Sequence, residues 1–173
     1  MSFKQLGRLG EKSVLVQDCV LKDLPQLELR PFQRSFGVLL LLDGINWGDV
    51  EMRNAADHLM SSGAQHITVN GYRADDAHDL LDKVRETHDV AGGPVIMTSC
   101  IDGSESKALE YAAISAFPDP ASSSAIAYVL IFRLSARSLA NADIQAILRE
   151  LNMGAGWDGD RGNNLGDCTV DLE

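Results

Sequence analysis

The chain has 173 residues, 45% of them hydrophobic, so it can bury one sizeable core, and neither number requires a second domain. Its 25 acidic and 15 basic side chains give a formal net charge of -10. Because duplex nucleic acid and anionic membranes bind positive surfaces, this balance argues against both as partners.

The cysteines and the N-terminus indicate the cellular compartment in which the protein is expected. Cys19, Cys100 and Cys168 lie far apart and form neither a CxxC pair nor a zinc-ligand spacing with histidine. We therefore expect a reducing compartment and no metal. The first residues lack the apolar core of a signal peptide, and no later segment reaches the roughly 18 apolar residues of a membrane span. A cytoplasmic location is expected.

Two N-terminal segments have weak strand character. Residues 13–20 are rich in β-branched side chains, and residues 26–29 alternate weakly between Pro25 and Pro31. Since proline interrupts the hydrogen-bond ladder of a sheet, both segments are predicted to be edge strands or an N-terminal hairpin.

The most apolar short segment is residues 36–42, Phe-Gly-Val-Leu-Leu-Leu-Leu, which ends at Asp43-Gly44. A strand exposed on one face would alternate polar and apolar residues, so this continuous run predicts a central strand covered on both faces. Helical spacing follows from Trp47 to Met60, and Ser62-Gly63 ends it. Strand, turn and helix make the first half of a βαβ unit.

Strands and helices continue to alternate along the chain. Further strands are predicted at residues 66–70, 95–97 and 125–134, the second of them as a buried run. Further helices are predicted to begin at Asp75-Asp76, at Asp102-Gly103-Ser104-Glu105 and at Asn141, with Pro118-Asp119-Pro120 ending the second of these. Strands separated by helices of this length favour parallel pairing with right-handed crossovers.

These elements predict an α/β fold over residues 1–152: a three-layer sandwich with a mostly parallel central sheet, Rossmann-like or flavodoxin-like. Residues 153–173 are rich in glycine and aspartate and lack periodicity, which predicts a flexible acidic tail. Asp158, Asp160, Asn163 and Asn164 match a calcium loop only in part, because the final glutamate and the flanking helices are missing.

An ordered set of residues between positions 38 and 134 supports the same fold. The set comprises Trp47, Leu59, Ser62-Gly63, Asn70-Gly71, Asp75-Asp76, Asp79, Val95-Ile96-Met97-Thr98-Ser99 and the acidic-apolar helix at 105–111. In this order it resembles a family of small bacterial α/β proteins, a domain of unknown function. Where that family has an aromatic residue and a histidine, this chain has Cys100 and Ile101. The resemblance implies the fold and no activity.

Ligands of an open α/β sheet bind outside the carboxyl ends of its strands, near helix N-termini. The polar residues expected at that rim are Asp43, Asn46, Asn70, Arg73, Ser99, Asp102 and Ser104. They predict a site for a small anionic ligand, nucleotide-like or a carboxylate, with Arg73 donating a charge-assisted hydrogen bond. The alternative is structural, since loops are polar and helices need caps in any protein.

Motifs for a specific reaction are missing. The glycines form no G-x-G-x-x-G or Walker A pattern, and no G-x-S-x-G elbow surrounds Ser99 and Cys100, to which no histidine can be assigned. The run from Asp75 to Asp79 fits either a metal or acid-base cluster or an acidic first helical turn. We assign no catalytic residue, no metal and no cofactor.

Two functional hypotheses stay open. The first is a cytosolic protein-binding domain without enzymatic activity, in a bacterial accessory, immunity or defence system. The second is an enzyme or sensor for the small anionic ligand. The apolar strand at 125–134 is expected near the sheet edge, protected by residues 13–20 or by a partner chain, and a homodimer with C2 symmetry is predicted.

Overall fold

The computed structural model of the chain describes residues 3–29, 32, 36–88, 96–115, 127–135, 138–154 and 169–170. Its elements are, in chain order, β1 (Phe3–Leu9), β2 (Lys12–Asp18), the 3-10 helix η1 (Leu21–Gln26), β3 (Phe36–Leu41), α1 (Asp49–Ser61), β4 (Ala64–Asn70), α2 (Ala74–His88), β5 (Met97–Cys100), α3 (Glu105–Ser115), β6 (Tyr128–Arg133), α4 (Asn141–Gly154) and β7 (Thr169–Val170).

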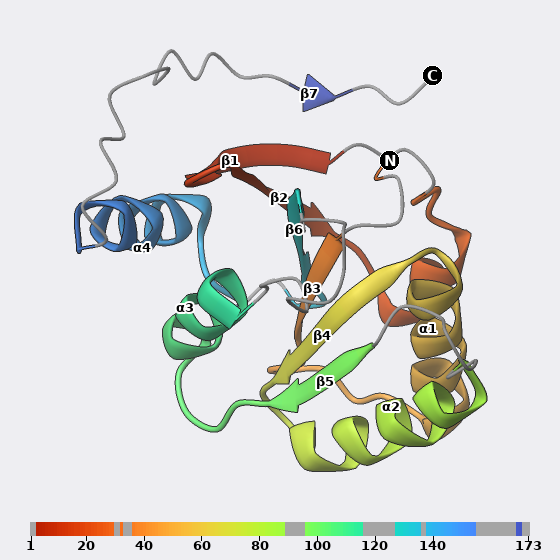
Figure 1. Cartoon of the computed structure of the whole chain (residues 1–173). Helices are drawn as coiled ribbons and strands as arrows, with labels where there is room; N and C mark the ends of the chain where they lie inside the picture. Colours follow the sequence, from red (N-terminus) through yellow and green to blue (C-terminus); the bar gives the residue numbers. More distant parts are fainter. Residues whose placement is uncertain are drawn as a thin grey trace.

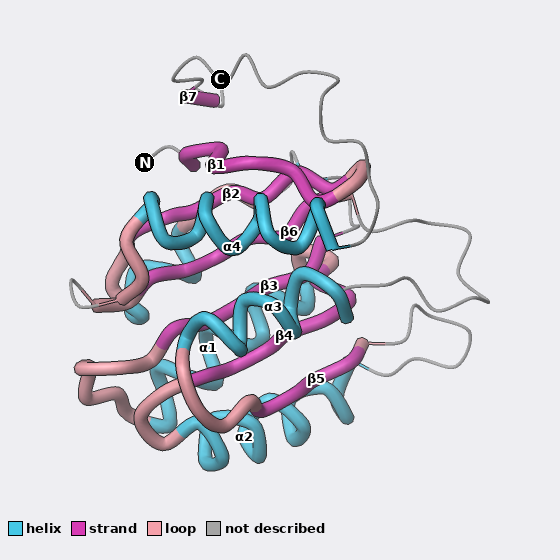
Figure 2. Tube along the Cα trace, turned by 90° about the vertical axis from the view of Figure 1, so that its left-hand side faces the viewer, coloured by secondary structure: helices cyan, strands magenta, loops and turns pink. Residues whose placement is uncertain are grey.

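The described strands form one mixed sheet in the order β5-β4-β3-β6-β2-β1-β7. Strands β5, β4, β3, β6 and β2 run parallel, whereas β1 is antiparallel to both β2 and β7. Figure 2 shows the strands following one another from β1 at the top to β5 at the bottom. The predicted α/β class and the mostly parallel sheet are therefore confirmed.

Helices cover both faces of the sheet, and each face has its own hydrophobic cluster. Leu40 and Ile67 pack with α1 and α2, whereas Leu39 and Ile131 pack with α3 and α4. Figure 1 shows these two helix pairs on opposite sides of the strands. Because successive side chains of a strand point to opposite faces, β3 must be apolar at every position. This explains the continuous apolar run in the sequence.

The N-terminal prediction is partly wrong. Residues 26–29 form no strand: Gln26 ends the 3-10 helix Leu21–Gln26, which has Pro25 inside it, and residues 27–29 have no regular secondary structure. Leu21, Leu24 and Leu27 are buried in the cluster on the α1 face. The spacing of three between Leu21 and Leu24 matches the three residues per turn of a 3-10 helix, which places these two on one side. This periodicity of three is the signal that the strand prediction missed.

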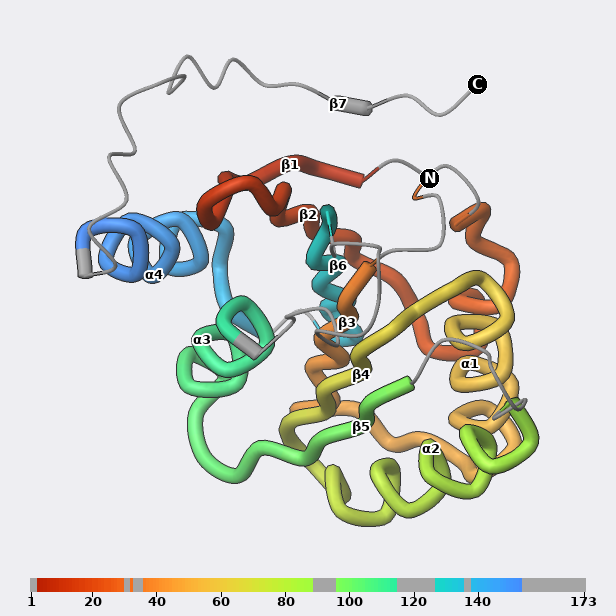
Figure 3. The backbone as a smooth tube through the Cα atoms, in the orientation of Figure 1, coloured from red at the N-terminus to blue at the C-terminus, as the bar shows by residue number. Residues whose placement is uncertain are grey.

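Residues 12–18 do form one strand of an N-terminal hairpin, but that strand is not at an edge. Strand β2 pairs with β1, whose strand character the sequence did not reveal, and with β6 in a register that joins Ser13 to Tyr128 and Asp18 to Arg133. The hairpin at the start of the chain, red in Figure 3, therefore lies beside the much later β6. The expected protection of β6 by residues 13–20 is confirmed.

The positions of β5 and β6 in the sheet differ from the expectation. Strand β6 lies in the interior between β3 and β2, and β5 forms an edge. The side chain of Met97 is 45% exposed, so the prediction of a buried run is wrong at this residue. An edge strand has a neighbour on one side only, and its side chains are less covered.

Several predictions concern parts of the chain outside the described residues. These are Val95, Pro118-Asp119-Pro120, residues 125–126, Cys168 and most of the Gly/Asp-rich tail with its Asp158 to Asn164 pattern. Within the described ranges, no helix is both long enough and apolar enough to cross a membrane.

Candidate functional site

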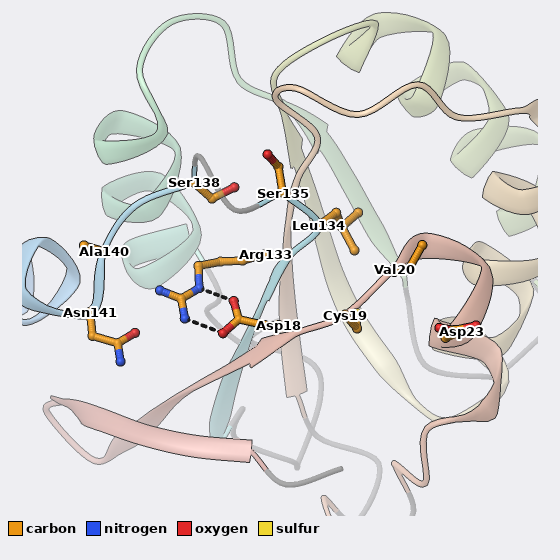
Figure 4. A pocket seen from close by; sticks show the side chains of 10 residues that line it. All are labelled: Asp18, Cys19, Val20, Asp23, Arg133, Leu134, Ser135, Ser138, Ala140 and Asn141. Atoms are coloured by element: carbon orange, nitrogen blue, oxygen red, sulfur yellow. Dashed lines mark hydrogen bonds and ion pairs between the residues drawn. The ribbon is translucent and has the colours of Figure 1, made fainter.

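A hollow of about 800 Å³ lies at the carboxyl ends of β2 and β6. After β2 the chain enters η1 on the α1 face of the sheet, and after β6 it enters α4 on the opposite face. Parallel neighbours whose connections leave to opposite faces open a crevice between them, where open α/β sheets bind ligands. Figure 4 shows the lining residues Asp18, Cys19, Val20, Asp23, Arg133, Leu134, Ser135, Ser138, Ala140 and Asn141. We name this feature the β2–β6 hollow.

An ion pair joins the ends of the two strands. Arg133 Nε and Nη2 donate to Asp18 Oδ1 and Oδ2, each at 2.7 Å, and Nη1 donates to the Leu139 carbonyl at 2.9 Å. The arginine side chain is only 12% exposed. Because Asp18 and Arg133 are register partners, strand pairing itself brings the two groups together in a bidentate geometry.

The charges around the β2–β6 hollow are mostly negative. Burial, with Asp18 and Asp23 adding to the effect, raises the pKa of the Cys19 thiol to about 12, so this thiol stays protonated. Glu105, at the start of α3, accepts a hydrogen bond from the Leu139 N–H at 2.6 Å, and burial raises the pKa of its carboxyl. Arg133 already neutralises Asp18. The negative charge that remains around the β2–β6 hollow favours a neutral or cationic ligand.

Asn141, the first residue of α4, lines the β2–β6 hollow. Its Oδ1 is buried and has no hydrogen-bond partner among the described residues. An unsatisfied buried acceptor costs about 1–3 kcal/mol, and a donor from a ligand would recover that cost. The walls formed by Val20, Leu134 and Ala140 are apolar.

The residues predicted from the sequence lie near the carboxyl ends of β3, β4 and β5 rather than those of β2 and β6, and none of them lines the β2–β6 hollow. Asp43 and Asn46 are exposed in the loop after β3. Ser104 caps α3, since its Oγ accepts a hydrogen bond from the Lys107 N–H at 3.3 Å. The expectation of an anion site at this rim stays a prediction.

Arg73 is held by the protein itself. Its Nε donates to Asp76 Oδ2 at 2.7 Å, its Nη1 donates to the Trp47 carbonyl at 3.3 Å, and the guanidinium stacks 4.3 Å from the Trp47 ring centroid. Asp49 lies 3.7 Å from Nη2. The backbone of Arg73 has a left-handed conformation with φ 56°, which is uncommon for a residue other than glycine. An anion would have to compete with two carboxylates for this side chain.

Asn70 and Asp102 belong to one loop arrangement. The buried Asn70 Nδ2 donates to the carbonyls of Ile101 and Gly103, at 2.7 and 3.2 Å, which holds the loop on both sides of Asp102. Asp102 lies with Asp75 and Cys100, and the potential ligand atoms of the three are all within 4.8 Å of one another. Burial, with Asp75 and Asp102, raises the pKa of Cys100 to about 11, and its Sγ–H donates to Asp75. The thiol therefore acts as a hydrogen-bond donor.

Ser99 lies within β5 rather than beyond its end. Its Oγ is 3.1 Å from His66 Nε2 and 3.0 Å from Thr68 Oγ1, so the structure brings a histidine to this serine. Within the run from Asp75 to Asp79, the side chains of Asp76 and His78 contact different partners. Asp76 pairs with Arg73, and His78 Nδ1 lies 3.9 Å from Asp82.

The sequence did not reveal Asp18, Arg133 and Asn141 as site residues. Each stands at the end of a predicted strand or at the start of a predicted helix, but their meeting depends on the β2–β6 pairing across more than a hundred residues. Comparisons of the chain with protein-family models, with curated proteins and with solved structures found no match. The functional proposal therefore rests on geometry.

Proposed function

We propose that this chain binds a small neutral or cationic molecule in the β2–β6 hollow. The observation that carries the proposal is the position of the hollow at the carboxyl ends of two adjacent parallel strands whose connections leave to opposite faces. Its volume of about 800 Å³ falls within the roughly 300–1,000 Å³ common for small-molecule sites.

The lining residues support a ligand with an apolar body and a hydrogen-bond donor. Val20, Leu134 and Ala140 provide apolar contact, and the buried Asn141 Oδ1 accepts a hydrogen bond from an amine or hydroxyl group. Asp23 adds a negative charge to the lining, which favours an ammonium group over a carboxylate or phosphate. The role is binding, as expected of a sensor, and no step of a reaction is assigned to this hollow.

Thermal unfolding of the full chain against small amines, neutral alcohols, carboxylates and nucleotides tests the proposal. A ligand present at one hundred times its dissociation constant adds about 2.7 kcal/mol to the free energy of unfolding. We expect amines or alcohols to raise the melting temperature. Stabilisation by anions alone would support the anion-binding hypothesis instead, and stabilisation by none of them would contradict a small-molecule site.

A variant pair locates the binding. Asn141→Leu removes the buried acceptor and should weaken the binding of a stabilising amine or alcohol about fivefold or more, since a buried donor left unpaired costs about 1–3 kcal/mol. Asn54→Leu, on the exposed face of α1, is the matched control and should leave affinity unchanged. Equal affinities for both variants would place the ligand elsewhere.

A finer description of the fold is also proposed. Four parallel strands lie side by side in the order β5-β4-β3-β6, with helices on both faces of the sheet. Numbered from one to four along the chain, these strands give the order 3-2-1-4. This supports a three-layer, Rossmann-like arrangement, since the dinucleotide-binding sheet begins with the same order. The cytoplasmic location and a role in a bacterial accessory system stay predictions.

A further inference from the structure

A row of polar side chains lies on the α3-facing side of β4. His66 is 2% exposed and Thr68 is 0% exposed, and Asn70 follows them on the same face. The equivalent face of the neighbouring strand β3, and of β6 beyond it, is aliphatic, with Leu39 and Ile131 in the cluster under α3 and α4. Burial of polar groups is unfavourable unless each is hydrogen-bonded. Aliphatic residues on β4 would pack against α3 equally well, so packing does not explain why these side chains are polar.

Ser99 lies beside this row on the edge strand β5. The register pairs Thr68 with Ser99, and the Ser99 hydroxyl lies within hydrogen-bond distance of both Thr68 Oγ1 and His66 Nε2. The His66 ring meets the Tyr111 ring of α3 edge-on, with centroids 6.0 Å apart. One oxygen thus has a buried imidazole on one side and a buried hydroxyl on the other.

Ser99 is less buried than His66 and Thr68, its two hydrogen-bond partners. Ser99 is half-buried, and beside it on the same strand Met97 is 45% exposed. Tyr111, which contacts His66, is 37% exposed. A serine hydroxyl within hydrogen-bond reach of an imidazole, here at 3.1 Å, is the arrangement that activates a serine nucleophile.

We propose that Ser99 is a nucleophile that His66 activates toward small, apolar acyl esters. With Nε2 unprotonated, Ser99 donates its hydrogen bond to His66 and accepts one from Thr68. The Ser99 Oγ forms a bond to the acyl carbon while its proton moves to His66 Nε2, and the carbonyl electron pair moves onto the carbonyl oxygen. The pair then returns, the bond to the leaving alkoxide breaks, and the alkoxide takes the proton from His66.

Water completes the cycle. It attacks the acyl-serine while His66 takes its proton, and collapse of the second tetrahedral intermediate releases the carboxylic acid and restores the Ser99 hydroxyl. Met97 and Tyr111 supply the exposed apolar surface that an acyl or alcohol group would contact. This activity does not depend on the β2–β6 hollow, because neither Ser99 nor His66 lines it.

The test uses the full chain and p-nitrophenyl acetate. We expect a burst of p-nitrophenolate with one acetyl group on Ser99, identified by peptide mass spectrometry. Ser99→Ala should abolish the burst, whereas Ser61→Ala, at an exposed position on α1, should retain it. His66→Gln should slow acetylation of Ser99 about 100-fold or more, the usual contribution of a general base. A burst that survives in Ser99→Ala would overturn the proposal.

If His66→Gln fails to fold, a second variant tests whether His66 activates position 99. Ser99→Cys places a thiol beside His66, where a neighbouring imidazole increases the thiolate fraction. Iodoacetamide should alkylate this thiol about tenfold or more faster than the thiol of Ser61→Cys. Equal rates for the two variants would show that His66 does not activate position 99.

Discussion

At the scale of single residues, Gly71 shows how closely the loops after β3 and β4 approach each other. Its φ is +107°, and a Cβ placed on it would lie 2.6 Å from the Asp43 backbone nitrogen. Gly103 has nearly the same φ, +106°, but its Cβ would meet only Lys107 Cδ at 3.7 Å. A substitution at Gly103 therefore introduces backbone strain alone, whereas a substitution at Gly71 introduces strain together with steric overlap.

We predict that Gly71→Ala destabilises the protein more than Gly103→Ala. Strain at such a φ costs about 1–3 kcal/mol for either variant. Overlap with the Asp43 backbone should add roughly 1–3 kcal/mol at Gly71 alone, as overpacking usually does. Urea unfolding measures both free energies. Equal losses would mean that the loop after β3 moves aside at no cost.

Glu105 provides a prediction for pH dependence. Burial raises the pKa of its carboxyl above the ordinary 4.5, so the folded protein binds this proton more tightly than the unfolded chain does. The stability that this carboxyl contributes is present below pH 4.5 and is lost as pH rises through the higher folded pKa.

Glu105→Gln cannot ionise and keeps an acceptor for the Leu139 N–H. We predict that its free energy of unfolding, relative to the wild type, increases as pH rises from about 4 to about 7. Denaturant unfolding at several pH values measures the difference. The matched control is Glu110→Gln, at an exposed position of the same helix. A difference that grows equally in the control would contradict the role of burial.

At the scale of elements, the β1–β2 hairpin covers an edge of the parallel sheet. Val14, Leu15 and Val16 of β2 are buried, and β2 pairs with β6 along the whole length of β6. Without the hairpin, an apolar strand would present unpaired N–H and C=O groups to solvent. The hairpin therefore protects the sheet from pairing with other chains.

We predict that deletion of residues 1–18 causes aggregation, because the exposed edge of β6 templates a further strand. Light scattering during refolding and sedimentation velocity measure the outcome. A truncated chain that remained soluble and monomeric would show that β6 needs no cover.

At the scale of the whole molecule, the predicted homodimer has a candidate surface near the loops after β3 and β4. Val50 is 71% exposed and Tyr72 is 54% exposed. They adjoin Asp49 and Arg73, which lie 3.7 Å apart. Exposed aromatic and aliphatic side chains beside an arginine are typical of protein interfaces.

We predict that the protein sediments as a dimer and that the double variant Val50→Asp, Tyr72→Asp sediments as a monomer, because buried unpaired charges oppose association. Met153→Asp, at a residue 74% exposed on α4, is the control and should leave the dimer intact. A monomeric wild type would contradict the prediction, and a dimeric double variant would place the interface elsewhere.

The sequence by itself determined the elements whose signal is local. The apolar run of β3, the helical spacing of α1 and α4 and the polar turn residues between them are properties of neighbouring positions. They predicted the α/β class and the central position of β3. The 3-10 helix η1 and the strand β1 were missed, because short segments of mixed polarity carry a weak periodic signal.

Only the tertiary structure decided where the candidate sites lie. The pairing of β2 with β6 brings Asp18 to Arg133, and the pairing of β4 with β5 brings His66 to Ser99. Strand order and register depend on which faces are buried together across distant parts of the chain, and the spacing of residues along the sequence does not encode that choice. The residues at the ends of strands were visible in the sequence, but which strand ends stand next to each other was not.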